Sequence, residues 1–189
     1  METCENMSVQ VPYIKAIFVL DSEGDRIAVN YSSKAKGLQE LKDQLEFEKK
    51  LHQKTCRTNA RVDAEILMFQ NCIAVYKFCS DAFFYVLADS NENELVVLSV
   101  LNALEETMSN LLRNQVSKKL LVENLDLLLL AIDEITDDGI IMEIDSTVLT
   151  NRVAMKGADK PAQDMPIAEQ TFSQALAIAK EQLVKSFNR

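Results

Sequence analysis

The stretch V-Y-K-F-C-S-D-A-F-F-Y-V, residues Val75–Val86, determines how this chain folds. Aromatic and β-branched residues fill both halves of the stretch, and the polar tripeptide Cys79-Ser80-Asp81 interrupts it. This pattern is typical of two β-strands joined by a turn. A similar run precedes it across the turn Gln70-Asn71. We therefore predict an antiparallel meander of three strands, over Ala64–Phe69, Cys72–Phe78 and Ala82–Ala88.

A hairpin is predicted upstream of the meander. Tyr13–Leu20 and Arg26–Tyr31 are β-rich runs, and the short polar loop between them contains Gly24. The first run is apolar on both faces except for Lys15, which predicts a central strand covered on both sides. Hairpin and meander together make about five strands, which is an ordinary size for a sheet.

Helices are predicted between and after the strands. Gly37–Leu51 carries Leu38, Leu41 and Leu45 at helical spacing, followed by a polar connector, His52–Arg61. Asn91 followed by Glu94 resembles a helix start. A Leu-rich helix then presents one apolar face and stops at a break over Arg113–Gln115. The residues of that face are Val97, Leu101, Leu104, Met108 and Leu111.

The second Leu-rich helix starts near Ser117 and is apolar around most of its circumference. Such a helix is buried on more than one side, so either a partner protein covers its outer side or the domain wraps it completely. Gly139 is a plausible C-terminal cap for this helix, and Ile140–Ile144 is a candidate for a short edge strand.

The remaining parts of the chain are predicted from composition and spacing. Residues 1–11 are expected to be a flexible N-terminus and residues 12–148 the folded domain. Residues 149–166 are predicted as a linker with Gly157, Pro161 and Pro166. Residues 167–189 are predicted as an amphipathic helix, with Phe172, Leu176, Ala179, Leu183 and Phe187 at helical spacing. This helix could dock on its own domain, fray in solution or pack on a partner.

The composition argues against nucleic acid and membranes as direct partners. The 189 residues carry a formal net charge of −9, whereas phosphate backbones and anionic lipids attract basic proteins. No apolar stretch approaches the ~20 residues of a membrane helix, and Met1–Val11 lacks the apolar core of a signal peptide. The four cysteines form no C-x-x-C pair, which favours reduced structural thiols in a cytosolic protein.

The polar clusters do not assemble a catalytic, cofactor or metal site. His52 and Cys56 lie four residues apart in the polar connector without an orienting third group, so we expect a solvated or capping histidine. Glu134–Asp145 resembles a calcium loop, but Asp145 stands where a bidentate Glu is needed. Glycine-rich phosphate-binding motifs are missing from the sequence. We therefore expect a protein that is not an enzyme and uses neither cofactor nor metal.

Several co-linear stretches resemble the zeta subunits of coatomer, the coat of COPI vesicles. They cover nearly the whole chain beyond the first ten residues. These stretches are Val11–Asp25, Val75–Val86, Glu92–Leu95, Val122–Asp126, Ala131–Glu143, Arg152–Gly157 and Glu169–Leu183. The family is similar to the sigma subunits of clathrin adaptors. The resemblance therefore implies an α+β, longin-like fold, in which helices flank a five-stranded antiparallel sheet and a C-terminal amphipathic helical tail follows.

The resemblance also implies partners and a place in the cell. It implies an obligate heterodimer with the gamma subunit of coatomer, next to other coatomer subunits. An Arf-family GTPase would recruit this coat to the cytoplasmic side of Golgi membranes and COPI-coated vesicles. The coat would act in Golgi-to-ER retrograde and intra-Golgi transport.

The residues expected to contact a partner are those whose helix or strand has another face for the domain's own core. In the domain they are Leu127, Leu129, Ile140 and Met142, and in the tail Phe172, Leu176 and Leu183. The alternative is an adaptor-type small subunit that binds short cargo sorting peptides directly. Around Gln115–Leu121, Lys118 and Lys119 replace the pattern associated with the pocket of sigma subunits, so no cargo pocket is assigned.

Overall fold

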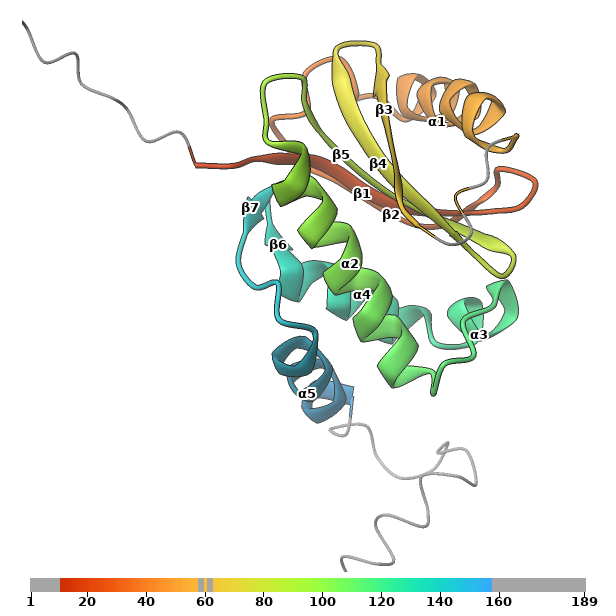
Figure 1. Ribbon diagram of the computed structural model, residues 1–189, viewed down its shortest axis with the longest axis vertical. Coiled ribbons are helices and arrows are strands. Elements are labelled where there is room, and N and C mark those ends of the chain that lie inside the picture. Colours follow the sequence, from red (N-terminus) through yellow and green to blue (C-terminus); the bar gives the residue numbers. More distant parts are fainter. Residues whose placement is uncertain (1–10, 58–59, 61–62, 158–189) are drawn as a thin grey trace, which may run out of the picture. The chain divides into compact units, whose positions relative to one another are not determined.

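The computed structural model describes residues 11–57, 60 and 63–157 of the chain. Strands and helices follow one another in an order that Figure 1 shows by colour. The elements are β1 (Ile14–Asp21), β2 (Arg26–Tyr31), α1 (Leu41–Thr55), β3 (Glu65–Phe69), β4 (Cys72–Cys79), β5 (Ala82–Asp89), α2 (Glu94–Leu111), α3 (Lys118–Glu123), α4 (Leu125–Ile135), β6 (Thr136–Asp137), β7 (Ile140–Ile141) and α5 (Ser146–Gly157).

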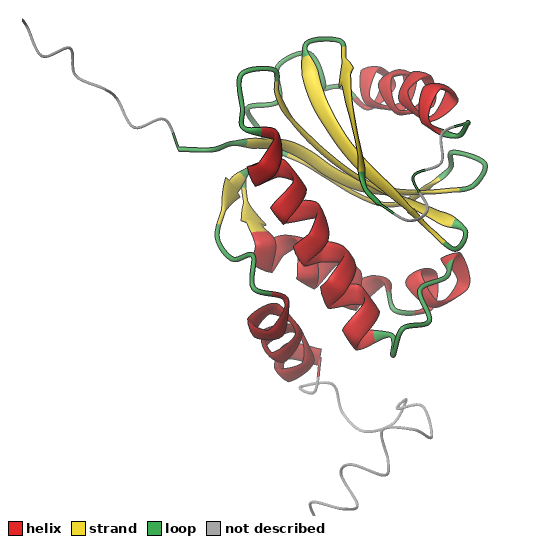
Figure 2. Cartoon of the chain, in the orientation of Figure 1, coloured by secondary structure: helices red, strands yellow, loops and turns green. Residues whose placement is uncertain are grey.

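Five strands form one antiparallel sheet in the order β2-β1-β5-β4-β3. Helix α1 covers one face of the sheet, and α2 and α4 cover the other (Figures 1 and 2). The predicted α+β, longin-like architecture is therefore confirmed, with β5 as the middle strand and β1 beside it. The meander and the first hairpin occur where the sequence predicts them.

Both faces of the inner strands are buried, which explains their nearly continuous apolar sequence. Side chains of β1, β4 and β5 alternate between a core under α2 and α4 and a core under α1. The α1 side holds a stack of aromatic rings, in which the centroid of Tyr85 lies 4.9 Å from that of Phe18 and 5.7 Å from that of Tyr76. The Tyr85 hydroxyl lies 2.7 Å from Thr55 Oγ1 of α1, which ties the helix to the sheet.

Helix α1 differs from the predicted helix in its bounds and in its buried face. It begins at Leu41, and Leu41 and Leu45 are exposed, whereas Glu48 and His52 are buried. The sheet reaches only the later turns of the helix. There Arg26 of β2 neutralises Glu48, with Nε 2.6 Å from Oε2 and Nη2 2.7 Å from Oε1. A buried carboxylate is tolerated because this cation binds it with both nitrogen atoms.

The Leu-rich helices have different ends from those predicted. Asn93, and not Asn91, caps α2, since its side chain accepts a hydrogen bond from the N–H of Leu95. The break after α2 is confirmed, with Arg113 and Asn114 at positive φ. The predicted second Leu-rich helix is two helices, α3 and α4, because the chain leaves helical geometry at Asn124.

The segment after α4 is a small hairpin, so two predictions need correction. Thr136 ends α4, and Gly139 with Asp138 forms the turn between β6 and β7. The predicted strand Ile140–Ile144 is shorter, since β7 covers only Ile140–Ile141, and it pairs with β6 outside the five-stranded sheet.

Helix α5 occupies residues that were assigned to the linker. Residues 149–157 are helical, and Leu149 and Val153 are buried in the core under α2 and α4. Their spacing of four residues places both on one helix face, which explains why the helix packs here. The expected flexible residues 1–10, the rest of the linker and the amphipathic helix over 167–189 lie outside the described residues.

Candidate partner interface

Large apolar side chains that the core does not use mark the candidate interface. In the described part of the chain they occur at the start of α1, on edge strand β3, along α3 and α4, and most densely around β7. The residues are Val11, Leu41, Leu45, Ile66, Met68, Leu95, Val122, Leu129, Ile140, Met142, Ile144 and Met155. Scattered exposed side chains of this kind are ordinary, whereas several along one edge indicate a binding surface.

Four of these side chains form what we call the apolar ribbon: Val11, Ile140, Met142 and Ile144. Their exposed fractions are 61%, 42%, 60% and 48%. Ile140, Met142 and Ile144 alternate with the less exposed Ile141 and Glu143, as expected for an extended segment. An isolated antiparallel bridge pairs Tyr13 with Ile140, so the segment before β1, which contains Val11, runs next to the β7 segment. The ribbon therefore consists of two neighbouring segments, and Ile140, Met142 and Ile144 share one face of the second segment.

The turn Asp138-Gly139 holds the ribbon against the sheet. The N–H of Ile14 donates to the carbonyl of Gly139 at 2.8 Å, and the N–H of Met142 donates to the carbonyl of Ile135 at 2.8 Å. Gly139 adopts a φ of +86°, and a Cβ atom there would lie 2.3 Å from the carbonyl oxygen of Ile14. Only glycine fits this left-handed and crowded position.

The carboxylate of Asp138 fastens the same turn to the loop after β2. Its Oδ1 accepts from the N–H of Ser33 at 2.7 Å and from Ser32 Oγ at 3.0 Å, and its Oδ2 accepts from Ser33 Oγ at 2.7 Å. The hydrogen bonds from Ser33 and Ser32 hold the pKa of Asp138 below its ordinary value. We call this arrangement the Asp138 clamp, and it joins segments about a hundred residues apart in sequence.

The structure brings together some of the residues expected at the interface and separates others. Ile140 and Met142 lie together on the ribbon. Leu127 is half-buried against the core, and Leu129 is 40% exposed on the outer side of α4. The domain therefore does not wrap the second Leu-rich segment completely. The tail residues Phe172, Leu176 and Leu183 lie outside the described residues.

Sequence reasoning missed two members of the ribbon. Val11 stood in the segment predicted to be flexible, and Ile144 was read as the end of a strand in the domain's own fold. The alternation of Ile140, Met142 and Ile144 with Ile141 and Glu143 was the available signal. The position of this segment on the domain, however, depends on the bridge between Ile140 and Tyr13, which are more than a hundred residues apart in sequence.

His52 is buried, which corrects the prediction of a solvated or capping side chain. It lies within α1 and meets the ring of Phe83 edge to face at a centroid distance of 5.2 Å. Cys56, four residues later, is exposed and donates to the carbonyl of Gln53. His52 therefore lies in the core and Cys56 at the surface, and the two side chains form no nucleophile–base pair in the structure.

The other described cysteines are unpaired thiols. Cys72 is buried beside Lys15, whose Nζ lies 3.4 Å from its Sγ. Burial, together with the charge of Glu105, raises the pKa of Cys79 to about 11. A thiol with this pKa stays protonated at neutral pH and is a poor nucleophile.

The stretch Gln115–Leu121 holds the end of strand β1. Lys118 Nζ lies 2.6 Å from Oδ2 of the buried Asp21, and the N–H of Lys118 donates to Asp81 Oδ1 at 2.6 Å. Lys119 is exposed and lies 3.8 Å from Glu123. Lys118 thus stabilises the fold, and neither lysine gives this stretch the character of an apolar peptide pocket.

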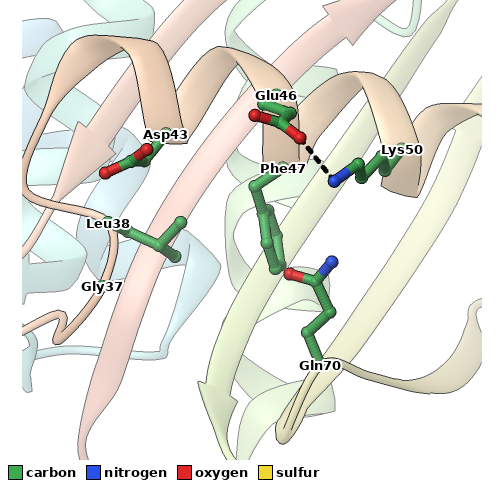
Figure 3. A pocket seen from close by; sticks show the side chains of 7 residues that line it. All are labelled: Gly37, Leu38, Asp43, Glu46, Phe47, Lys50 and Gln70. Carbon is green, nitrogen blue, oxygen red and sulfur yellow. Dashed lines mark hydrogen bonds and ion pairs between the residues drawn. The ribbon is translucent and has the colours of Figure 1, made fainter.

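A small hollow lies between α1 and the β3–β4 turn (Figure 3). Its volume is about 180 Å³, and ligand pockets usually measure roughly 300–1,000 Å³. Leu38 and Phe47 provide apolar lining, and the ion pair between Glu46 and Lys50 lies along its rim. No three His, Cys, Asp or Glu side chains of the described residues gather as a metal site would require.

Comparison with known proteins places the chain in a family. Residues 13–160 match the family model described as clathrin adaptor complex small chain. Coatomer subunit zeta-3 of Arabidopsis thaliana is 45% identical over 93% of this chain and 94% of its own length. Coatomer subunit zeta-1 of Homo sapiens is 42% identical over 93% of both chains, and coatomer subunit zeta-1 of Oryza sativa subsp. japonica is 41% identical over 98% of both.

A chain of a larger complex shares the fold. A chain in the homology model of the full-length AP-3 complex in a stretched open conformation superposes with a TM-score of 0.61. The match covers 85% of this chain and 98% of that one, at 16% identity, so it supports the fold alone. Sequence relatives and fold agree: the chain belongs to the clathrin adaptor complex small chain family and, within it, to the coatomer zeta subunits.

Proposed function

We propose that this chain is the small, non-enzymatic subunit of the COPI coat and forms an obligate heterodimer with the gamma subunit of coatomer. The observation that carries the proposal is 40–45% identity to coatomer zeta subunits over at least 93% of the chain. Through the assembled coat, the chain would serve Golgi-to-ER retrograde and intra-Golgi transport. Its place would be the cytoplasm and the cytoplasmic side of Golgi membranes and COPI-coated vesicles.

Attachment to the membrane would be indirect. No helix among the described residues is both long and apolar enough to cross a membrane. The net charge of −9 also gives the chain no electrostatic attraction to anionic lipid. Other coatomer subunits and an Arf-family GTPase would therefore hold the chain at the membrane.

The mechanism that we propose is burial of apolar surface. Obligate interfaces commonly bury about 2,000 Å² or more and resemble a domain core cut in two. Leu129, Ile140 and Met142 are apolar and at least two-fifths exposed, and the partly buried Leu127 lies two residues before Leu129. We assign these four residues to the contact with the gamma subunit, and extend the contact to Phe172, Leu176 and Leu183 of the tail.

Co-expression with the gamma subunit tests the heterodimer. The full chain should co-purify with gamma-coatomer at a one-to-one ratio, and an unrelated protein used as a control bait should not retain it. Limited proteolysis of the free chain and of the complex then tests the tail. Protection of residues 158–189 only in the complex would support its place at the interface. Failure of the two chains to co-purify would refute the heterodimer.

A further inference from the structure

We propose that the apolar ribbon binds a basic amphipathic segment of the gamma subunit, which covers the ribbon with apolar side chains and places Lys or Arg beside the surrounding carboxylates. The inference rests on the proposed function, because it names the chemistry that the gamma subunit brings to this surface. It also adds Val11 and Ile144 to the expected contact.

The ribbon is apolar on the face that the domain does not use. Ile141 packs against the core, whereas Ile140, Met142 and Ile144 extend from the same segment and are 42–60% exposed. Val11 adds a fourth apolar side chain from the segment before β1. Groups of exposed apolar side chains with a polar border are typical of protein-binding surfaces.

The ribbon is also held in place before any partner arrives. Three contacts fix the turn Asp138-Gly139 to the rest of the domain. They are the hydrogen bond from Ile14 to Gly139, the bridge between Tyr13 and Ile140, and the Asp138 clamp. A preformed surface loses little conformational entropy on binding, which favours a stable complex.

Negative charge surrounds the ribbon and selects a basic partner. Carboxylates lie at its turn, along it and at its end. They are Glu92, which accepts from the N–H of Tyr13, together with Asp137, Asp138, Glu143 and Asp145. Two cations of the described residues lie nearby: Lys34, over the ring of Tyr13, and Arg152, whose guanidinium lies 3.6 Å from Glu143.

Among the ribbon carboxylates of the described residues, Glu143 has an ion pair, with Arg152 at 3.6 Å. Asp137, Asp138 and Asp145 lie in a stretch of sequence, residues 136–151, that contains no Lys or Arg. Serine hydroxyls and backbone N–H groups satisfy the oxygens of Asp138, and backbone N–H groups satisfy Oδ1 of Asp145. These neutral donors do not cancel the charges. Complementary basic side chains on the partner would therefore gain both attraction and orientation.

A second copy of this chain fits the ribbon less well. In a two-fold dimer the same surface would face itself, so the carboxylates of one ribbon would meet those of the other. Like charges brought together at an interface cost binding free energy. The surface therefore favours a partner of opposite charge over self-association.

Variants of the full chain, each co-expressed with gamma-coatomer, test the inference. Met142→Ser removes an apolar side chain, and Asp137→Lys reverses an exposed charge whose side chain makes no hydrogen bond with any described residue. Leu41→Ser on α1 is a control of matched exposure, at 61% against 60% for Met142, and Glu106→Lys on the exposed side of α2 controls for charge. Dissociation of each purified complex on dilution is measured at 0.1 and 0.5 M NaCl.

We expect Met142→Ser to weaken the complex tenfold or more at both salt concentrations, since one buried apolar side chain accounts for about one decade of affinity. Asp137→Lys should weaken it several-fold at 0.1 M NaCl and much less at 0.5 M, because salt screens surface charge. The two controls should stay within twofold of the wild type.

Three results would overturn the inference while leaving the heterodimer intact. In the first, Met142→Ser binds as tightly as the wild type. In the second, Asp137→Lys has no effect at either salt concentration, which removes the basic character of the partner. In the third, the free chain is a dimer that Met142→Ser converts to a monomer, which makes a second copy the occupant. If the wild-type chain fails to bind gamma-coatomer, the proposed function itself fails.

Discussion

At the scale of single residues, Gly139 is a position where the fold tolerates only glycine. We expect Gly139→Ala to lower the free energy of unfolding by about 2 kcal/mol or more, because a left-handed φ and a close approach act together. A Cβ atom would lie 2.3 Å from the Ile14 carbonyl oxygen and 2.7 Å from the ring of Tyr13. Urea unfolding of the full chain measures the loss.

Gly37 supplies the matched control for that variant. Its φ is +80°, close to the +86° of Gly139, but a Cβ atom there would meet nothing within 4 Å. Gly37→Ala should therefore cost only the backbone strain, about 1 kcal/mol. Equal losses in the two variants would show that the contact with Ile14 and Tyr13 does not matter.

Asp21 makes stability depend on pH in the acid range. Burial alone would raise the pKa of its carboxyl group, but hydrogen bonds from Lys118 and from the N–H groups of Asp25 and Glu23 outweigh burial and lower it. Its folded pKa thus lies below the unfolded value of about 3.9. The stabilisation is therefore present above about pH 4 and lost as the pH falls through the folded pKa.

We expect Asp21→Asn to destabilise the chain at pH 7 and to lose this disadvantage toward pH 3. The asparagine cannot bind Lys118 as an anion, and below the folded pKa the wild-type carboxyl group is neutral as well. Urea midpoints at pH 7, 5 and 3 measure the effect, with Asp137→Asn as the control. A constant difference between Asp21→Asn and the wild type across this range would contradict the prediction.

At the scale of elements, the strands could be predicted more closely than the helices. Strands β4 and β5 are apolar on both faces because α1 covers one side and α2 and α4 the other, so composition alone revealed them. The face of α1 could not be predicted, because Glu48 is buried only where Arg26 arrives from β2. Likewise, the break at Asn124 and the packing of α5 depend on tertiary contacts.

The same limit applies to the candidate interface. An apolar sequence with a free face pointed to Ile140 and Met142, and their exposure agrees with that reading. The part played by Val11 could not be read from local sequence, because it depends on a bridge between Tyr13 and Ile140. Long-range pairing of this kind leaves little trace in periodicity.

The β6–β7 hairpin allows a prediction at this scale. Two-residue strands are marginal by themselves, so the Asp138 clamp should decide how often the hairpin opens. We expect Asp138→Ala to speed amide hydrogen exchange of Ile141 and Met142, while amides of β4 and β5 keep their protection. Ser33→Ala, which removes one hydroxyl donor and keeps the backbone N–H, should have a smaller effect. Unchanged exchange at Met142 would show that the hairpin holds without the clamp.

At the scale of the whole molecule, the chain combines a sheet that is covered on both faces with apolar side chains that remain exposed at the surface. Both faces of the sheet are covered, and the core under α2 and α4 extends to α5. The exposed apolar side chains contribute little to this core, so they are free to serve an interface. One set of apolar residues therefore stabilises the fold, and a different, exposed set is available for binding.

If the proposed heterodimer forms, this separation predicts how the gamma subunit changes the thermal stability of the chain. A partner that binds only the folded chain stabilises it by mass action, by about 2.7 kcal/mol at a free concentration of 100 Kd. The Tm of the chain should therefore rise with gamma-coatomer concentration. Met142→Ser should reduce this rise and leave the Tm of the free chain within about 1 °C, because its side chain is 60% exposed and adds little to the core.

Leu101→Ala provides the opposite pattern, because Leu101 is fully buried in the core. It should lower the free energy of unfolding of the free chain by about 2–5 kcal/mol and leave the rise caused by gamma-coatomer unchanged wherever the chain still folds. Differential scanning fluorimetry across a gamma-coatomer titration separates the two patterns. If Met142→Ser lowered the Tm of the free chain as much as Leu101→Ala, the ribbon would belong to the core, and its assignment to a partner would be wrong.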